Sequence, residues 1–453
     1  MPMDIKTQLS RHGLFDAKVP RYTSYPTSPH FSDVTGPAAH ADWIAAIPPG
    51  AAISLYIHVP FCRHLCWFCA CRTQGTQSTA PVAAYLQTLL SELRMLKAHL
   101  PEGVALSRLH WGGGTPTLLT PAMMETLAGA IADVAPLAPH AEFSVEIDPN
   151  EVDDARLSVL SAAGMNRASI GVQDFDPQIQ KCIGREQSYE VTRDVVAAIR
   201  DHGVYSLNAD ILYGLPHQTP GKITQSVQKL LSLSPDRVAL YGYAHVPWMA
   251  RRQSLLPADT LPAPEQRLAL FEVARQMFQW DGYAEIGIDH FALAGDGLEI
   301  AQKAGLLRRN FQGYTDDTSD VLIGVGASSI SRFPQGYTQN NAATSGYTAA
   351  IRNSVFSTVR GHAFTHEDRL HGRIIEALMC DFEVRTGELS AHFDVAPTAL
   401  TAMFNEVAAQ FPDLLRVTTD GLFIPQPVRP LTRMIARAFD RYDTAPARHS
   451  SAI

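Results

Sequence analysis

The sequence contains 453 residues, of which 46% are hydrophobic and 18% are charged, so it is long enough to bury one large core and a smaller second core. Its formal net charge of -8 argues against general attraction to nucleic acid or anionic lipid, and an anionic ligand would need locally placed basic side chains. The first residues lack the apolar core of a signal peptide, and no run of about 18 apolar residues appears, so we expect a cytoplasmic protein without a membrane span.

The first fifty residues are rich in Pro, Ser, Thr and His. Prolines in the segment PRYTSYPTSPHF (20–31) disfavour a helix and predict an extended stretch. We therefore expect an N-terminal arm over residues 1–50.

From residue 52 onward, short β-branched or apolar runs alternate with longer amphipathic helical patterns, which is typical of repeated βα units. The expected helices include residues 82–100, 189–203 and 222–233. The expected strands cover residues 53–59, 107–112, 142–148, 167–172, 207–214 and 237–243. Six strands, each followed by a helix and joined by right-handed connections, would form an open partial (β/α)6 barrel, so we predict an α/β fold over residues 51–360.

Beyond residue 360 the pattern changes to helices at 366–382 and 398–411, a hairpin at 416–425 that turns at Asp-Gly, and a last helix at 431–442. This pattern predicts a mainly α-helical C-terminal domain over residues 361–453. We expect the tail YDTAPARHSSAI to be disordered.

Four of the six cysteines, Cys62, Cys66, Cys69 and Cys71, lie within ten residues, which predicts metal binding rather than a disulfide framework. Thiolates suit zinc or iron–sulfur clusters. The first three offer thiolates from one loop, whereas a structural zinc site usually takes paired ligands from two separate knuckles. Cys71 and His64 could nevertheless complete a zinc shell, so zinc remains an alternative. Three thiolates on a four-iron cluster would leave one iron open to a small molecule.

The segment YIHVPFCRHLCWFCAC (56–71) resembles the signature of radical S-adenosylmethionine enzymes. In that superfamily the open iron of a [4Fe-4S] cluster chelates S-adenosylmethionine, and reductive cleavage gives methionine and a 5′-deoxyadenosyl radical. The resemblance therefore implies the partial barrel of that superfamily, with Cys62, Cys66 and Cys69 as cluster ligands.

Further motifs are similar to those of the oxygen-independent coproporphyrinogen III oxidases of haem biosynthesis. In chain order they are RYTSYPT (21–27), HWGGGTPT (110–117), GVQDF (171–175), REQ (185–187), DILYGLP (210–216), YAHVP (243–247) and NFQGYT (310–315). Trp67 and Ala70 stand where that family usually has Tyr and Gly, and neither change removes a ligand. The resemblance implies oxidative decarboxylation of two propionates of coproporphyrinogen III to vinyl groups, giving protoporphyrinogen IX. It also implies a monomer that accepts electrons from a protein such as flavodoxin or ferredoxin.

The same resemblance implies contacts with S-adenosylmethionine, bound as two molecules, at residues that match the family pattern. These residues are Tyr56, Phe68, Gly113, Gly114, Thr115, Glu146, Gln173, Arg185, Asp210, Ala244 and Ile330. Arg185 suits a ligand carboxylate and Asp210 suits ribose hydroxyls, although either residue taken singly is more often structural. Most of the set follows the ends of expected strands, where barrel folds build their active sites.

The four propionates of the substrate require cations. The candidates on expected rim loops are Arg21, Arg63, Arg72, Arg251, Arg252, Arg308, Arg309 and Arg332. Three alternatives to the oxidase stay open: a haem-transfer chaperone on the same barrel, a radical methyl-transfer enzyme of haem breakdown, and a zinc-stabilised scaffold.

Overall fold

The computed structural model describes residues 5–442 and 449–453. The chain folds into two compact units: Met1–His30, Pro262–Asp316 and Phe364–Ile453 form unit 1, and Phe31–Leu261 with Asp317–Ala363 form unit 2. Each unit contains segments that are far apart in the sequence but contact one another in the fold. The division of the chain into domains 1–50, 51–360 and 361–453 rests on sequence patterns alone, and it stays a prediction.

Unit 2 is built on a curved sheet. Its strands are β1 (Ala52–Val59), β4 (Ala105–Gly113), β5 (Leu137–Ile147), β6 (Arg167–Gln173), β7 (Ser206–Tyr213), β8 (Arg237–Gly242), β13 (Leu322–Val325), β14 (Ile330–Phe333), β15 (Gly336–Asn340) and β16 (Thr358–Ala363). Within this unit they lie in the order β16-β15-β14-β13-β1-β4-β5-β6-β7-β8. The pairs from β13 to β8 are parallel, and those from β13 to β16 are antiparallel.

The six strands expected from the sequence are confirmed, and so is the open partial barrel, since the order does not return from β8 to β13 among the described residues of unit 2. Sequence reasoning missed β13 to β16. Three of these strands are only four or five residues long and two of them contain glycine, so they lack a clear alternating pattern. As a consequence β1 is an internal strand, paired with β13 on one side and β4 on the other.

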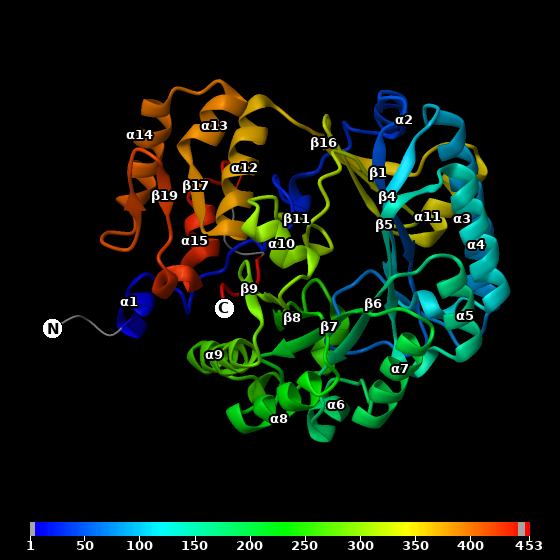
Figure 1. Ribbon diagram of the computed structural model, residues 1–453, viewed down its shortest axis with the longest axis horizontal. Helices are drawn as coiled ribbons and strands as arrows, with labels where there is room; N and C mark the ends of the chain where they lie inside the picture. Colours follow the sequence, from blue (N-terminus) through cyan, green and yellow to red (C-terminus); the bar gives the residue numbers. More distant parts are fainter. Residues whose placement is uncertain (1–4, 443–448) are drawn as a thin grey trace. The chain divides into compact units, whose positions relative to one another are not determined.

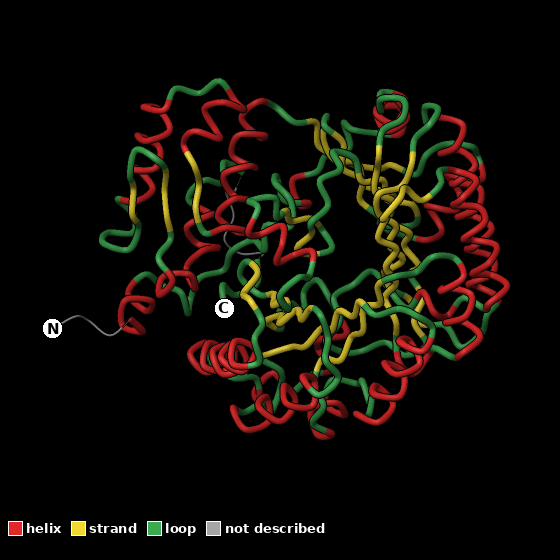
Figure 2. The backbone as a smooth tube through the Cα atoms, viewed as in Figure 1, coloured by secondary structure: helices red, strands yellow, loops and turns green. Residues whose placement is uncertain are grey.

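Helices cover the outer face of this sheet (Figures 1 and 2). The helices of unit 2 are α2 (Pro37–Ala45), α3 (Ala80–His99), α4 (Pro121–Val134), α5 (Asp154–Ala162), α6 (Pro177–Cys182), α7 (Tyr189–Asp201), α8 (Pro220–Leu231) and α11 (Thr344–Arg352). In α3, the buried side chains of Leu86, Leu89, Leu93 and Leu96 recur every three or four residues and face the sheet. Side-chain caps fix the starts of others: the hydroxyl of Thr120, for example, accepts a hydrogen bond from Met123 N at the start of α4.

Unit 1 is mainly helical. It contains the helices α1 (Ile5–Arg11), α9 (Pro264–Trp280), α10 (Gly297–Lys303), α12 (His366–Asp381), α13 (Thr386–Phe393), α14 (Pro397–Ala408) and α15 (Thr432–Arg437). Its short strands are β9 (Ala284–Ile286), β10 (His290–Ala292), β11 (Arg308–Asn310), β12 (Gly313–Thr315), β17 (Glu383–Arg385), β18 (Arg416–Val417) and β19 (Gly421–Phe423). Tyr22 and Tyr25 of the RYTSYPT motif are buried in the core of this unit, and Tyr25 accepts a hydrogen bond from Arg441 N.

Three predictions about the C-terminal segment need correction. The hairpin at 416–425 gains a third strand, because β17 pairs with β19, and the last α-helix ends at Arg437. Residues 443–448 of the expected disordered tail lie outside the described residues. After them, Ser451 pairs with Lys18 and Ile453 is buried, so this stretch is ordered by contacts that a local pattern does not encode. No helix in the described part of the chain is long and apolar enough to cross a membrane.

Candidate active site

A cysteine-bearing loop leaves the carboxyl end of β1, and hydrogen bonds hold both of its ends. The short strands β2 (Phe61–Cys62) and β3 (Gln74–Gly75) pair at the base of the loop. Thr115 N donates to Phe61 O at 2.7 Å, and Thr76 N donates to Cys62 O at 3.0 Å. The loop therefore starts from a fixed frame.

Glycines after β4 allow the close approach of this frame. A Cβ on Gly114 would lie 2.5 Å from Phe61 O, and one on Gly113, where φ is +114°, would lie 2.6 Å from the His58 ring. Both distances are too short for any side chain, so only glycine fits between β4 and the loop. The GGG segment is thus a structural requirement for the site.

The cysteine thiols of the loop differ in their surroundings. Burial raises the pKa of Cys62 to about 11, although a hydrogen bond with Thr115 works against this effect. Burial also raises the pKa of Cys66. A hydrogen bond from the Cys71 thiol lowers the pKa of Cys69 to about 6, and the same bond raises the pKa of Cys71. Of these four thiols, that of Cys69 therefore loses its proton most easily.

These cysteines suit a metal cluster by their chemistry. Among the described residues no three His, Cys, Asp or Glu side chains already form a metal-ligand set. Cys62, Cys66 and Cys69 nevertheless lie close enough for their charges to affect one another, and Cys69 Sγ accepts a hydrogen bond from Cys71 N at 3.4 Å. Three soft donors on one loop, beside the cation of Arg185, fit an anionic iron–sulfur cluster.

Arg185 connects the cysteine loop to the strand ends. Its Nη1 lies 3.6 Å from Cys66 Sγ and 3.4 Å from Asp148 Oδ2, and its Nη2 donates to Gly171 O at 3.0 Å. Asp148 and the Cys66 sulfur outweigh the effect of burial and raise the pKa of Arg185. Its Nε is buried and has no hydrogen-bond partner among the described residues.

Glu146 and His110 form a pair on neighbouring strands. The ring of His110 stacks on Tyr56, with 5.6 Å between centroids, and its Nε2 lies 3.3 Å from Glu146 Oε1. Gly113 N donates to the other carboxylate oxygen of Glu146 at 3.0 Å. Partial burial opposes the charge of Glu146, but these hydrogen bonds outweigh it and lower its pKa. Glu146 is therefore held as an anion, ready for a cationic group.

Asp210 and Gln173 lie on β7 and β6. Asn208 Nδ2 donates to Asp210 Oδ1 at 3.0 Å. Partial burial, reinforced by the charge of Glu146, raises the pKa of Asp210 to about 7. Gln173 has a φ of +67°, and its amide lies against Gly171, the residue whose carbonyl binds Arg185.

Gln253 joins the cysteine loop to the end of β8, and sequence reasoning missed it. Its Nε2 donates to Phe68 O at 2.7 Å and to Ala244 O at 3.0 Å, and its Oε1 accepts from Val246 N at 2.6 Å. The residue is 1% exposed. No motif marks this glutamine in the sequence, because its role depends on contacts across 185 residues.

Ile330 begins β14 beside β13, which pairs with β1 at Tyr56. The carbonyl of Ile330 lies so close to Gly324 that a Cβ there would approach it to 2.6 Å. The cluster ligands and cofactor-binding residues expected from the sequence thus all lie in unit 2, on strands that neighbour one another or on the loops that follow them.

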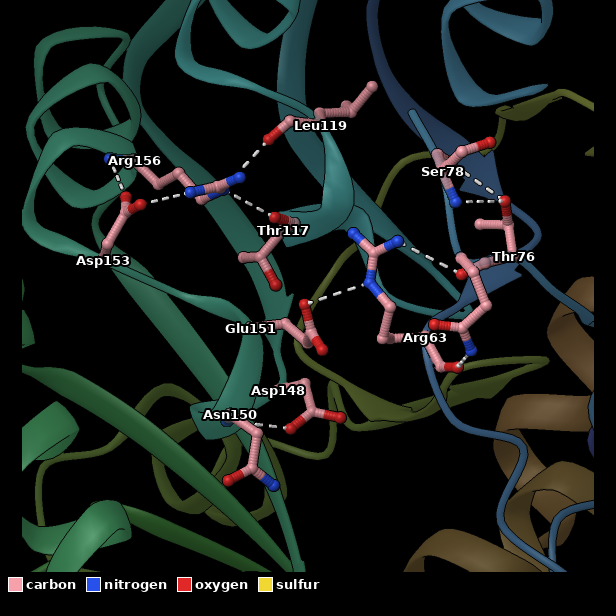
Figure 3. A network of polar contacts seen from close by, with 11 residues as sticks. Arg63, Thr76, Ser78, Thr117, Leu119, Asp148, Asn150, Glu151, Asp153 and Arg156 are labelled. Carbon is pink, nitrogen blue, oxygen red and sulfur yellow. Dashed lines mark hydrogen bonds and ion pairs between the residues drawn. The ribbon is translucent and has the colours of Figure 1, made fainter. Parts of the chain in front are cut away.

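The arginines expected to bind propionates differ in their partners. Figure 3 shows Arg63 between Glu151, at 3.7 Å, and Thr76 O, at 3.2 Å, so its charge is already engaged. In unit 1, Arg308 pairs with Glu376 and Arg309 with Asp289. Arg252 instead donates to backbone and hydroxyl oxygens of the cysteine loop.

Comparison with known proteins agrees with this geometry. The profile of the Radical SAM superfamily matches residues 56–230. The chain is 65% identical over 451 residues to an oxygen-independent coproporphyrinogen III oxidase of Paracoccus denitrificans, with 100% of both chains covered. It is 58% identical to one of Cereibacter sphaeroides, covering 97% of this chain and 98% of the relative.

The solved structure of coproporphyrinogen III oxidase from Escherichia coli, described as a radical SAM enzyme, superposes with a TM-score of 0.89. It is 34% identical in sequence and covers 93% of this chain and 97% of its own. Taken with the full-length relatives, this match shows that the chain belongs to the oxygen-independent coproporphyrinogen III oxidase family of the Radical SAM superfamily.

Proposed function

We propose that this chain converts two propionates of coproporphyrinogen III to vinyl groups without oxygen, giving protoporphyrinogen IX. The observation that carries this proposal is the cysteine loop, with Arg185 against Cys66, in a chain that aligns from end to end with a relative of that name. The E. coli enzyme of the same name shares its fold.

Membership of the superfamily implies a [4Fe-4S] cluster and S-adenosylmethionine. In our proposal Cys62, Cys66 and Cys69 hold the cluster. Bound together, the two cofactors supply a carbon radical strong enough to take hydrogen from an unactivated C–H bond. Cys71 is left as the hydrogen-bonding neighbour of Cys69.

The protein side chains then bind and orient S-adenosylmethionine. Glu146 would accept hydrogen bonds from its ammonium group, Arg185 would pair with its carboxylate through the positive charge of the guanidinium, and Asp210 would bind ribose hydroxyls. Tyr56, Phe68, Gly113, Gly114, Thr115, Gln173, Ala244 and Ile330 complete the proposed cofactor-binding set. Because the set extends over several strand ends, we propose that it serves two S-adenosylmethionine molecules.

Exclusion of water falls to apolar side chains of the loop. Trp67 and Phe68 pack against the buried cluster that contains Ile183, Leu212 and Tyr243. An apolar wall beside a radical site limits side reactions with solvent. Trp67 is anchored because its N donates to Ile183 O at 2.9 Å.

We further propose that the protein works as a cytoplasmic monomer and receives electrons from a flavodoxin or ferredoxin. The six free cysteines support a reducing compartment such as the cytoplasm. The donor is required because reductive cleavage consumes an external electron. Size-exclusion chromatography would test the monomer, and reduction of the reconstituted protein by purified flavodoxin would test the electron donor.

An anaerobic assay tests the proposed reaction. Protein reconstituted with iron and sulfide is given S-adenosylmethionine, reductant and coproporphyrinogen III, and we expect protoporphyrinogen IX and carbon dioxide. S-adenosylmethionine cleavage without decarboxylation would reject the substrate. A Cys66→Ala variant should lose the cluster absorbance, whereas Cys182→Ala, outside the loop, should keep it. Colourless protein rich in zinc would reject the cluster assignment.

A further inference from the structure

Three arginines of unit 2 lie around the cysteine loop and the neighbouring strands β14 to β16. Arg252 Nη2 donates to Cys71 O at 3.1 Å and to Thr73 Oγ1 at 3.0 Å, so it borders the segment that carries Arg72. Arg360 Nε donates to Gln339 Oε1 at 2.7 Å. The side chain of Arg72 is exposed, and that of Arg360 is half-buried.

Contacts through His58 and Ser328 connect Arg360 to the loop. Gln339 Nε2 donates to Ser328 O at 3.0 Å. The hydroxyl of Ser328 lies 3.4 Å from His58 Nε2, and the same nitrogen lies 3.5 Å from Arg72 O. Arg72 and Arg360 therefore lie on two sides of one polar hub at the end of β1.

Strand register places Arg360 on the face that carries Ile330. Ile330 is opposite Gln339 on β15, and Gln339 is opposite Arg360 on β16. Side chains directly opposite one another in antiparallel strands point to the same face. Arg360 thus shares a face with a residue of the proposed cofactor-binding set.

The three arginines have no carboxylate ion-pair partner in the described part of the chain, although the charge of Cys69 interacts with that of Arg252. No carboxylate of the described residues forms an ion pair with Arg72, Arg252 or Arg360, whereas other half-buried arginines of the unit, such as Arg167 and Arg185, have one. Burial and the repulsion from Arg72 lower the pKa of Arg360. Both terminal nitrogens of Arg360 have no protein partner in the described part of the chain, which leaves a fork for two oxygens.

We propose that Arg72 and Arg360, with Arg252 beside the segment that carries Arg72, form a subsite that binds a carboxylate, and that this carboxylate is a propionate of the tetrapyrrole. The assignment of this carboxylate to the tetrapyrrole rests on the proposed function, since S-adenosylmethionine also carries a carboxylate. The subsite fixes the substrate while the reacting propionate stays free beside the cofactor. Of its members, Arg360 was absent from the candidates that the sequence suggested.

The test compares Arg72→Gln, Arg360→Gln and the double variant with wild type as reconstituted holoenzyme, and Arg352→Gln is the exposed control at the end of α11. We expect the KM for coproporphyrinogen III to rise about tenfold in each single variant, because each loses a charge-assisted hydrogen bond. Cluster absorbance, which reports folding, and the KM for S-adenosylmethionine should stay unchanged. Arg360→Lys, which keeps the charge but loses the fork, should fall between Gln and wild type.

Direct binding separates this proposal from the proposed reaction. Coproporphyrin III has four propionates and mesoporphyrin IX has two, and binding of either can be followed by porphyrin fluorescence without turnover. Loss of coproporphyrin binding in the double variant supports the subsite even if wild type does not decarboxylate. Wild-type affinity in the double variant overturns it. An increase confined to the KM for S-adenosylmethionine assigns the carboxylate to the cofactor and also overturns the proposal.

Discussion

The guanidinium of Arg185 lies 3.6 Å from the sulfur of Cys66 and also contacts Asp148 and the carbonyl of Gly171. One side chain thereby joins the cysteine loop, the residue after β5 and the strand β6. This position makes Arg185 the strongest link between a proposed cluster ligand and the proposed cofactor site.

Replacement of Arg185 by Lys should weaken S-adenosylmethionine binding. Lysine keeps a positive charge but cannot contact Gly171, Asp148 and a ligand at once, since it lacks the planar fork. We expect the KM for S-adenosylmethionine to rise about tenfold, with iron content near that of wild type. Arg193→Lys, an exposed arginine on α7, is the matched control. Unchanged cofactor binding in Arg185→Lys would contradict the assigned role.

Gly114→Ala should damage the frame of the loop. The new methyl would lie 2.5 Å from Phe61 O, which is a backbone atom that cannot rotate away. We expect lower iron incorporation and a lower thermal midpoint. Gly129→Ala in α4 meets nothing within 4 Å and should stabilise the protein by about 0.5 to 1 kcal/mol. Equal iron content in both variants would show that the frame tolerates a side chain.

Glu92 predicts a specific pH dependence of stability. This carboxyl on α3 is 2% exposed and accepts hydrogen bonds from Gly326 N, Tyr347 and Asn340. Burial raises its pKa to about 7 from a usual 4.5, so the folded state holds the proton more tightly than the unfolded chain. Its contribution to stability is fully present below pH 4.5 and is lost as pH rises to about 7.

Glu92→Gln should remove this dependence. Relative to the variant, the wild type should lose about 3 kcal/mol at most in free energy of unfolding between pH 4.5 and 7. Anaerobic denaturant titrations at several pH values measure the free energy of unfolding of both proteins. Contributions from other titratable groups cancel when the variant is subtracted from the wild type. Glu102→Gln, an exposed residue, should keep the wild-type pH profile. Parallel profiles for wild type and Glu92→Gln would reject the prediction.

Gln253→Leu should loosen the cysteine loop. Leucine leaves the backbone groups of Phe68, Ala244 and Val246 without partners, at a cost of about 2 kcal/mol or more. We expect lower stability and faster bleaching of the cluster in air. Gln228→Leu on the exposed face of α8 is the control. Bleaching at the wild-type rate in Gln253→Leu would mean that the loop is held by other contacts.

The sequence by itself determined the features whose signals are local. The six barrel strands follow from runs of apolar residues, and the spacing of Cys62, Cys66 and Cys69 predicted a metal-binding loop whose chemistry fits a cluster. The family also followed from short motifs in order, and the comparisons confirm it. Backbone geometry and ligand chemistry both constrain residues that are close in the sequence, so these patterns are visible within short segments.

Only the tertiary structure decided which distant residues meet. Gln253 reaches Phe68 across 185 residues, Glu92 reaches Tyr347 across 255, and Arg360 belongs to a strand that the sequence did not predict. A lone buried glutamine, glutamate or arginine carries no periodic signal, because its partners are set by how the sheet and helices pack. The physical reason is that a hydrogen bond or ion pair depends on distance in space, which the fold creates between residues that the chain keeps far apart.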